Sequence, residues 1–120
     1  MNRRRERGQA TVEFALLLPV VVMAALAVIQ VALIVRDHVS TVHAAREAVR
    51  AASVDPDPGA ATRAARRVLA RAKVHVGARP PVGEQITVEV DFVSRTRLPL
   101  VGALFPDPTL EATAVMRVER

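Results

Sequence analysis

The hydrophobic pattern of the chain begins with one long apolar segment. From Phe14 to Val35 there are 22 consecutive residues without a formally charged side chain. At about 1.5 Å per helical residue this segment is roughly 33 Å long, which is enough to cross a hydrocarbon core of about 30 Å. The segment is apolar on all sides, whereas a helix in a soluble core needs only one apolar stripe. It therefore predicts a membrane-spanning helix.

Helical periodicity continues beyond this segment. We expect one helix over residues 9 to about 53, in which residues 9–35 span the membrane and residues 36–53 continue the helix outside it. The predicted apolar stripe of the continuation follows steps of three and four, with alanines beside it: Val35, Val39, Val42, Arg46 and Val49. Two prolines and a glycine within residues 55–59 end the helix in a turn.

A second helix is expected from near Ala60 to about Lys73, because apolar residues recur on one face and arginines on the other. The apolar face carries Ala61, Ala64, Ala65, Val68, Leu69 and Ala72, and the basic face carries Arg63, Arg66, Arg67 and Arg71.

The last third of the chain changes to alternation with a period of two. Residues 86–92 and 110–118 each alternate apolar and polar side chains, which is typical of half-buried strands. Residues 74–76 are expected to form a short first strand before a turn at 77–83. Between the two longer strands, residues 98–106 are too apolar for an ordinary surface loop. The predicted fold class is α+β, with a long N-terminal helix, a second helix and a small antiparallel sheet.

Charge gives the orientation of the predicted span. The chain has 120 residues and a formal net charge of +5. A group of four arginines precedes the span: Arg3, Arg4, Arg5 and Arg7. Lys and Arg next to a span stay in the cytoplasm, so we expect a single-pass protein of the plasma membrane with its N-terminus inside and residues 36–120 outside. Because the outer part is only mildly basic and lacks aromatic platforms, no nucleic-acid partner is expected.

Glu13 is the residue whose chemistry needs an explanation. A charged side chain at the centre of a membrane helix costs about 2.5–3.5 kcal/mol, and less near the interface. Cleavage after Gly8 would give Gln9 a new α-amine, four residues before Glu13 on the same helix face or next to it on an adjacent subunit. A small glycine at the cut suits a protease that holds extended backbone closely. Without cleavage, Glu13 is an acid at the headgroups, neutralised by Arg7 or by protonation.

Other residues give weaker signals. Pro19 predicts a kink, or a point of local melting when helices pack together, and the two interpretations are equally supported. His38, His43 and His75 lack the spacing of a metal site. Residues 55–59 resemble the start of a calcium loop only faintly and are better explained as a turn. We expect no cofactor, and no enzyme activity, since no second acid or base accompanies Glu13.

Residues 8–19, Gly-Gln-Ala-Thr-Val-Glu-Phe-Ala-Leu-Leu-Leu-Pro, resemble the TadE-like minor pilins of the tight-adherence (Flp) pilus system, and residues 98–105 and 112–119 are loosely similar to that family. The resemblance implies a pilin-like fold and a type IV prepilin that a prepilin peptidase cuts between Gly8 and Gln9. It also implies a role in pilus assembly for surface adhesion or secretion, with other pilins or pseudopilins, the inner assembly platform and membrane lipid as partners. Whether the chain is incorporated in the surface pilus or stays in the membrane as an assembly factor is left open by the sequence. Many major pilins carry Phe where Gln9 stands, so N-methylation of residue 9 stays open.

Two alternatives use the same residues differently. In the first, the chain is an uncleaved single-pass anchor for a small extracytoplasmic binding or sensing domain. In the second, it is a secreted module released near Ala27, although the apolar segment is longer than a typical signal peptide needs. The favoured organisation is a basic leader at 1–8, a transmembrane helix at 9–35, its continuation at 36–53 and an outer α+β domain at 54–120.

Overall fold

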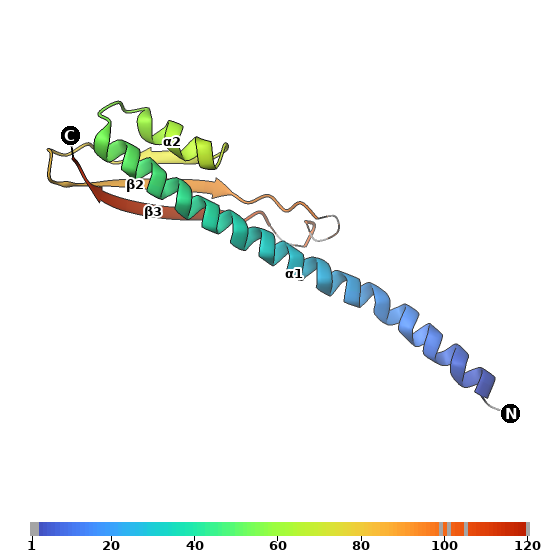
Figure 1. The fold of residues 1–120 in the computed structure, drawn as a ribbon. Helices are drawn as coiled ribbons and strands as arrows, with labels where there is room; N and C mark the ends of the chain where they lie inside the picture. The colour runs from blue at the N-terminus through green and yellow to red at the C-terminus, as the bar shows by residue number, and fades with distance from the viewer. Residues whose placement is uncertain (1–2, 99, 101, 105, 120) are drawn as a thin grey trace. The chain divides into compact units, whose positions relative to one another are not determined.

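The computed structural model describes residues 3–98, 100, 102–104 and 106–119, with side chains of the first helix described from Gly8 onward. These residues form two compact units (Figure 1). One contains the first helix up to Leu33 together with Thr96–Pro106, and the other contains Ile34–Arg95 and Asp107–Arg120. The predicted α+β class is confirmed.

The first helix, α1, runs from Arg3 to Val54 and is 52 residues long. It begins six residues earlier than predicted because arginine and glutamate favour helix, and nothing before Gly8 interrupts it. Pro19 lies inside α1, and the helix continues through it. Helix α1 ends where predicted, since Asp55 precedes Pro56 and the residue before a proline disfavours helical backbone angles.

The buried face of α1 is mostly alanine, and the predicted valine stripe is buried only at Val49 and partly at Val42. Val35 and Val39 are 56% and 51% exposed, and Arg46 is also exposed. The residues that are buried lie on a neighbouring face: Thr41, Ala44, Ala45, Ala48, Val49, Ala52 and Ser53. Small side chains allow the helix backbone to come close to its neighbours, so packing distance rather than side-chain hydrophobicity selects the face that is covered.

The second helix, α2 (Ala60–Val68), is shorter than predicted because Leu69 adopts an extended conformation, with φ −140° and ψ 93°. Four of its alanines are buried, whereas Val68 is 42% exposed. The turn before α2 is held by Asp57, whose carboxylate accepts the backbone N–H of Gly59 at 3.0 Å and contacts Arg63 at 2.5 Å. The hydrogen bond from Gly59 and the charge of Arg63 lower the pKa of Asp57.

The sheet has the order β1-β2-β3 and is antiparallel throughout, with strands Lys73–Val76, Gln85–Val93 and Thr109–Arg117. All three strands were predicted. Ile86, Val88 and Val90 of β2 are buried and pack in one cluster with the alanines of α1 and α2, while Phe92 is only partly buried. Both helices therefore cover the same face of the sheet.

Hydrogen bonds attach the end of α1 to the sheet and its loops. The guanidinium of Arg79 donates to the carbonyl oxygens of Ala52 and Asp55, and the backbone N–H of Glu119 donates to the carbonyl oxygen of Ser53 at 2.9 Å. Further along α1, Ser94 Oγ donates to a carboxylate oxygen of Asp37 at 2.7 Å. These contacts hold residues 34–54 of α1 in a fixed register on the sheet.

The alanine face of α1 predicts the effect of enlarging one of its residues. Ala48 is completely buried, so Ala48→Leu places three extra carbons in a closely packed region and should lower the free energy of unfolding by about 1–3 kcal/mol. Ala70, which is exposed in the turn after α2, is the matched control, and Ala70→Leu should change stability little. Denaturant unfolding of the full chain in detergent, followed by circular dichroism, compares the two. Equal stability of both variants would show that the alanine face is not tightly packed.

Candidate functional site

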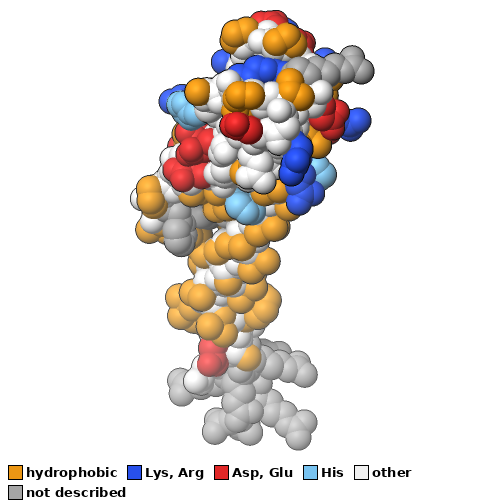
Figure 2. All heavy atoms as spheres, turned by 90° about the vertical axis from the view of Figure 1, so that its left-hand side faces the viewer, with side chains coloured by type: hydrophobic (Ala, Val, Ile, Leu, Met, Phe, Trp, Pro, Cys, Tyr) orange, Lys and Arg blue, Asp and Glu red, His pale blue; other side chains and the backbone are white. Residues whose placement is uncertain are grey.

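Helix α1 carries the residues to which the sequence assigned a function. Within the described residues it is long and apolar enough to cross a membrane, judged by length and composition: its most apolar 18-residue window has a mean hydropathy of 2.8. Only 6% of that window is buried. Figure 2 shows hydrophobic side chains over the visible surface of this segment. Its large apolar side chains therefore lack protein cover, which is costly in water and favourable in lipid.

The proposed cleavage residues lie on the surface of this helix. Gly8, Gln9 and Glu13 are all exposed, and with Val12 and Leu16 they line one face. A Cβ atom added to Gly8 would meet nothing within 4 Å, so this glycine is not required for packing. Gln9 and Glu13 are four residues apart in the helix, so the two side chains are neighbours on this face. The pairing of Glu13 with an α-amine on Gln9 stays a prediction, because that amine exists only after cleavage.

The side chains of Arg3, Arg4, Arg5 and Arg7, assigned to topology, lie outside the described residues. Their backbone belongs to α1, so the leader and the apolar segment form one continuous helix. The bond between Gly8 and Gln9 is accordingly in helical backbone rather than in an extended segment.

Gln30, which the sequence favours as a polar contact between helices, is 4% exposed within a largely exposed apolar segment. Its Oε1 atom is buried and accepts no hydrogen bond from the described residues. The chain segment that shares a compact unit with this part of α1 is Thr96–Pro106. The unusual apolarity of residues 98–106 was the sequence signal that this segment is not an ordinary surface loop, although nothing in the pattern identified its neighbours.

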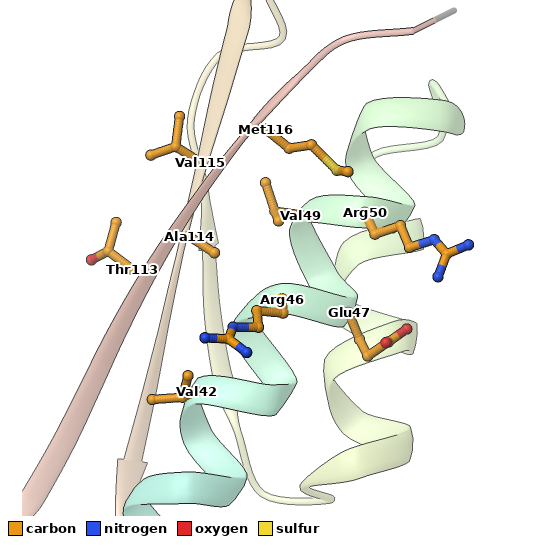
Figure 3. Close-up of a pocket in the computed structure, with 9 residues that line it drawn as sticks. All are labelled: Val42, Arg46, Glu47, Val49, Arg50, Thr113, Ala114, Val115 and Met116. Carbon is orange, nitrogen blue, oxygen red and sulfur yellow. The ribbon is translucent and has the colours of Figure 1, made fainter.

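A second feature that the sequence did not reveal is a groove of about 540 Å³ between α1 and β3 (Figure 3). It is lined by Val42, Arg46, Glu47, Val49, Arg50, Thr113, Ala114, Val115 and Met116. In Figure 3 the side chains of Glu47 and Arg50 point away from β3, whereas that of Arg46 extends along the groove. The groove therefore combines apolar side chains with the guanidinium of Arg46, while Glu47 and Arg50 lie at its border.

The β3 strand borders this groove with a free edge. Ser94 N–H donates to Pro108 O at 2.9 Å and Val118 N–H donates to Glu84 O at 2.8 Å, in the register of the β2–β3 pair. Since hydrogen-bonded pairs alternate in an antiparallel ladder, the even-numbered residues of β3 bond to β2. The odd-numbered residues direct their N–H and C=O groups outward: Thr109, Glu111, Thr113, Val115 and Arg117. No other strand pairs with this edge within the described residues.

No group of three or more His, Cys, Asp or Glu side chains that could hold a metal ion occurs in the described part of the chain. His38 and His43 are exposed on α1. His75 Nε2 lies 3.2 Å from Asp91 Oδ2 across the β1–β2 pair, so this histidine is paired rather than only solvated. Residues 55–59 form the predicted turn, in which Asp55 and Asp57 accept backbone N–H groups.

Comparison with known families supports the N-terminal resemblance. The family described as TadE-like protein matches residues 8–50, which is about a third of the chain and contains Gly8, Gln9, Glu13 and Pro19. Comparisons with curated proteins and with solved structures gave no match. The matched region ends before α2, so the loose similarity of residues 98–105 and 112–119 is not part of it. The resemblance predicted from residues 8–19 is confirmed: residues 8–50 of this chain carry the sequence pattern of the TadE-like family.

Proposed function

We propose that this chain is a membrane-anchored minor pilin or pseudopilin that acts in the assembly of a tight-adherence (Flp) pilus, with surface adhesion or secretion as the result. The observation that carries the proposal is the position of Glu13. It is an exposed carboxylate at the edge of the apolar part of α1, within the segment that matches the TadE-like family. The TadE-like match supports an association with the Tad pilus.

The first step is hydrolysis of the Gly8–Gln9 peptide bond by a prepilin peptidase on the cytoplasmic side. Water adds across the bond, Gly8 keeps the new carboxylate and Gln9 keeps the new amine, which is protonated near neutral pH. The reaction removes four arginines and one glutamate with the leader. It therefore removes the charges that retain the N-terminus in the cytoplasm and supplies one cation at the end of the helix.

The second step is lateral packing of the processed helix. Glu13 has no ion-pair partner among the described residues, so its carboxylate is available to the α-amine of Gln9 in the same or a neighbouring subunit. An intermolecular pair of this kind fixes the axial position of one helix against the next, because moving either helix by one turn separates the charges by about 5.4 Å. Pro19, which removes one backbone N–H inside α1, gives the helix a point at which it can bend during packing.

The outer unit contacts neighbouring pilins in this proposal. Its free β3 edge and the adjoining groove present unpaired backbone groups, apolar side chains and the cation of Arg46. A strand edge with these properties recognises another extended backbone. The inner assembly platform and membrane lipid are the remaining proposed partners, and the proposed activity is structural rather than enzymatic.

One observation favours the alternative of an uncleaved anchor with an outer binding or sensing domain. Helix α1 runs without a break through Gly8, whereas a peptidase acts on extended backbone. Processing therefore requires local unwinding of the first turns, which contain no buried contacts at Gly8. An anchor that keeps its leader needs no such unwinding, so the N-terminus of the mature protein separates the two functions.

We expect the protein isolated from its native cells to begin at Gln9. Gly8→Leu should abolish processing, since the larger side chain obstructs the close approach of the peptidase, while the fold stays unchanged because the added atoms meet open space. Gly8→Ala is the graded control and should be processed more slowly than the natural chain. Mass spectrometry of the N-terminal peptide identifies the first residue of the natural chain and of both variants. An intact arginine leader on native protein in piliated cells would overturn the proposed processing.

Glu13 gives a second test. We expect Glu13→Ala to insert into the membrane and to be cleaved normally, but to reduce the number of pili severalfold, because the helices lose the charge pair that sets their register. The control is Val12→Ala, at a residue that is 60% exposed beside Glu13. Membrane fractionation and electron microscopy of negatively stained cells measure the two effects. Normal piliation with Glu13→Ala would remove this carboxylate from the mechanism.

A further inference from the structure

We propose that the loop Thr96–Pro106 is a second membrane contact of this chain, which inserts into the outer lipid–water interface beside α1. This inference rests on the proposed membrane anchoring of α1. It concerns a different segment of the chain. The proposed role in pilus assembly does not require this segment to contact lipid.

The first argument is the location of the loop. Thr96–Pro106 belongs to the same compact unit as α1 up to Leu33, which is the part of the helix that is apolar enough to span a membrane. Gln30 is the most buried residue of this part of α1, at 4% exposure, and the loop is the segment of the unit available to cover it.

The second argument is depth. Gln30 precedes Val35, the last uncharged residue before Arg36, by five residues. At about 1.5 Å per residue this places it roughly 7–8 Å inside the outer end of the apolar segment. Amphipathic elements that lie in the interface penetrate about 5–10 Å. A loop that covers Gln30 is therefore at the depth of the interface rather than in the surrounding water.

The third argument is the surface that the loop presents. Leu100 and Leu104 are 70% and 66% exposed, and residues 98–106 contain no charged side chain. Leu100 has a φ of 70°, a left-handed conformation that is unfavourable for leucine and that directs the chain through a tight turn. The backbone N–H of Gly102 donates to the carbonyl oxygen of Leu98 at 3.4 Å, which satisfies part of the backbone internally. Internal hydrogen bonds are what an apolar environment requires of a loop.

The fourth argument concerns what contacts this surface, and it favours lipid. Arg95 and Arg97 are exposed immediately before the apolar residues, where their guanidinium groups can reach lipid phosphates while Leu100 and Leu104 enter the apolar region. The surface is also continuous with the lipid-exposed part of α1, because the loop and this helix segment form one unit. A protein partner would not require cationic residues beside an uncharged apolar loop at this depth.

The natural chain contains no cysteine, so single labels can be placed cleanly. Leu104→Cys in the full chain, spin-labelled and reconstituted in vesicles of phosphatidylethanolamine and phosphatidylglycerol, is compared with Val82→Cys, since Val82 is equally exposed at 65% but lies outside the loop. Collision of each label with oxygen, which concentrates in lipid, and with a water-soluble nickel chelate is measured by electron paramagnetic resonance. We expect the ratio of oxygen to nickel collision to be severalfold higher for residue 104 than for residue 82.

Val21→Cys, at a 61% exposed residue in the middle of the apolar segment, separates failure of this inference from failure of the proposed anchoring. A label at 21 that contacts lipid, with a label at 104 as accessible to nickel as that at 82, overturns only the loop contact. If the label at 104 is shielded from both oxygen and the nickel chelate, protein covers it. That result also overturns the loop contact. If the label at 21 is itself in water, the membrane anchoring fails and the loop contact fails with it.

Discussion

The close approach between the alanine face of α1 and the sheet is the interaction on which the outer unit depends. Ala44, Ala45 and Ala48 are almost completely buried, and the strand residues opposite them, Val88 and Val90, are equally inaccessible. Alanine loses no side-chain conformational freedom on burial, so a helix face made of it is inexpensive to order. It also contributes little apolar area, and the outer unit has no disulfide to compensate. The hydrogen bonds of Arg79 and Glu119 to the end of α1 add to this small core.

One helix thus carries two kinds of surface without a change in its backbone. Up to Leu33 its apolar side chains are mostly exposed, and after Ile34 Val35 and Val39 stay exposed while most alanines and Val49 are covered. The change follows from the sequence: β-branched and leucine side chains encircle the first part, and alanine recurs at helical spacing in the second. A membrane helix needs apolar side chains around its whole surface, whereas a core helix needs them on one face only. The first part of α1 has the first kind of surface, and the second part has the second kind.

Patterns with strong periodicity were predictable. The alternation in residues 86–92 and 110–118 identified both long strands, and Pro56, Pro58 and Gly59 identified the end of α1. The buried face of α1 was predictable only in part: Val49 and alanines beside the valine stripe are buried, whereas Val35 and Val39 are exposed. The free edge of β3 escaped prediction, since it depends on contacts between segments that are distant in sequence. The four-residue helical spacing of Gln9 and Glu13 was predictable because it depends only on local helix geometry, whereas their proposed function stays a prediction.

The free edge of β3 has a further consequence. Its outward groups are on odd-numbered residues, and the bonds to β2 are on even-numbered ones. A strand added at this edge would therefore bond to groups that no existing ladder uses, and the three-stranded sheet would become four-stranded without breaking a hydrogen bond already present. Gaining or losing a neighbour at β3 leaves the interior of the outer unit unchanged, so association at this edge is reversible without refolding.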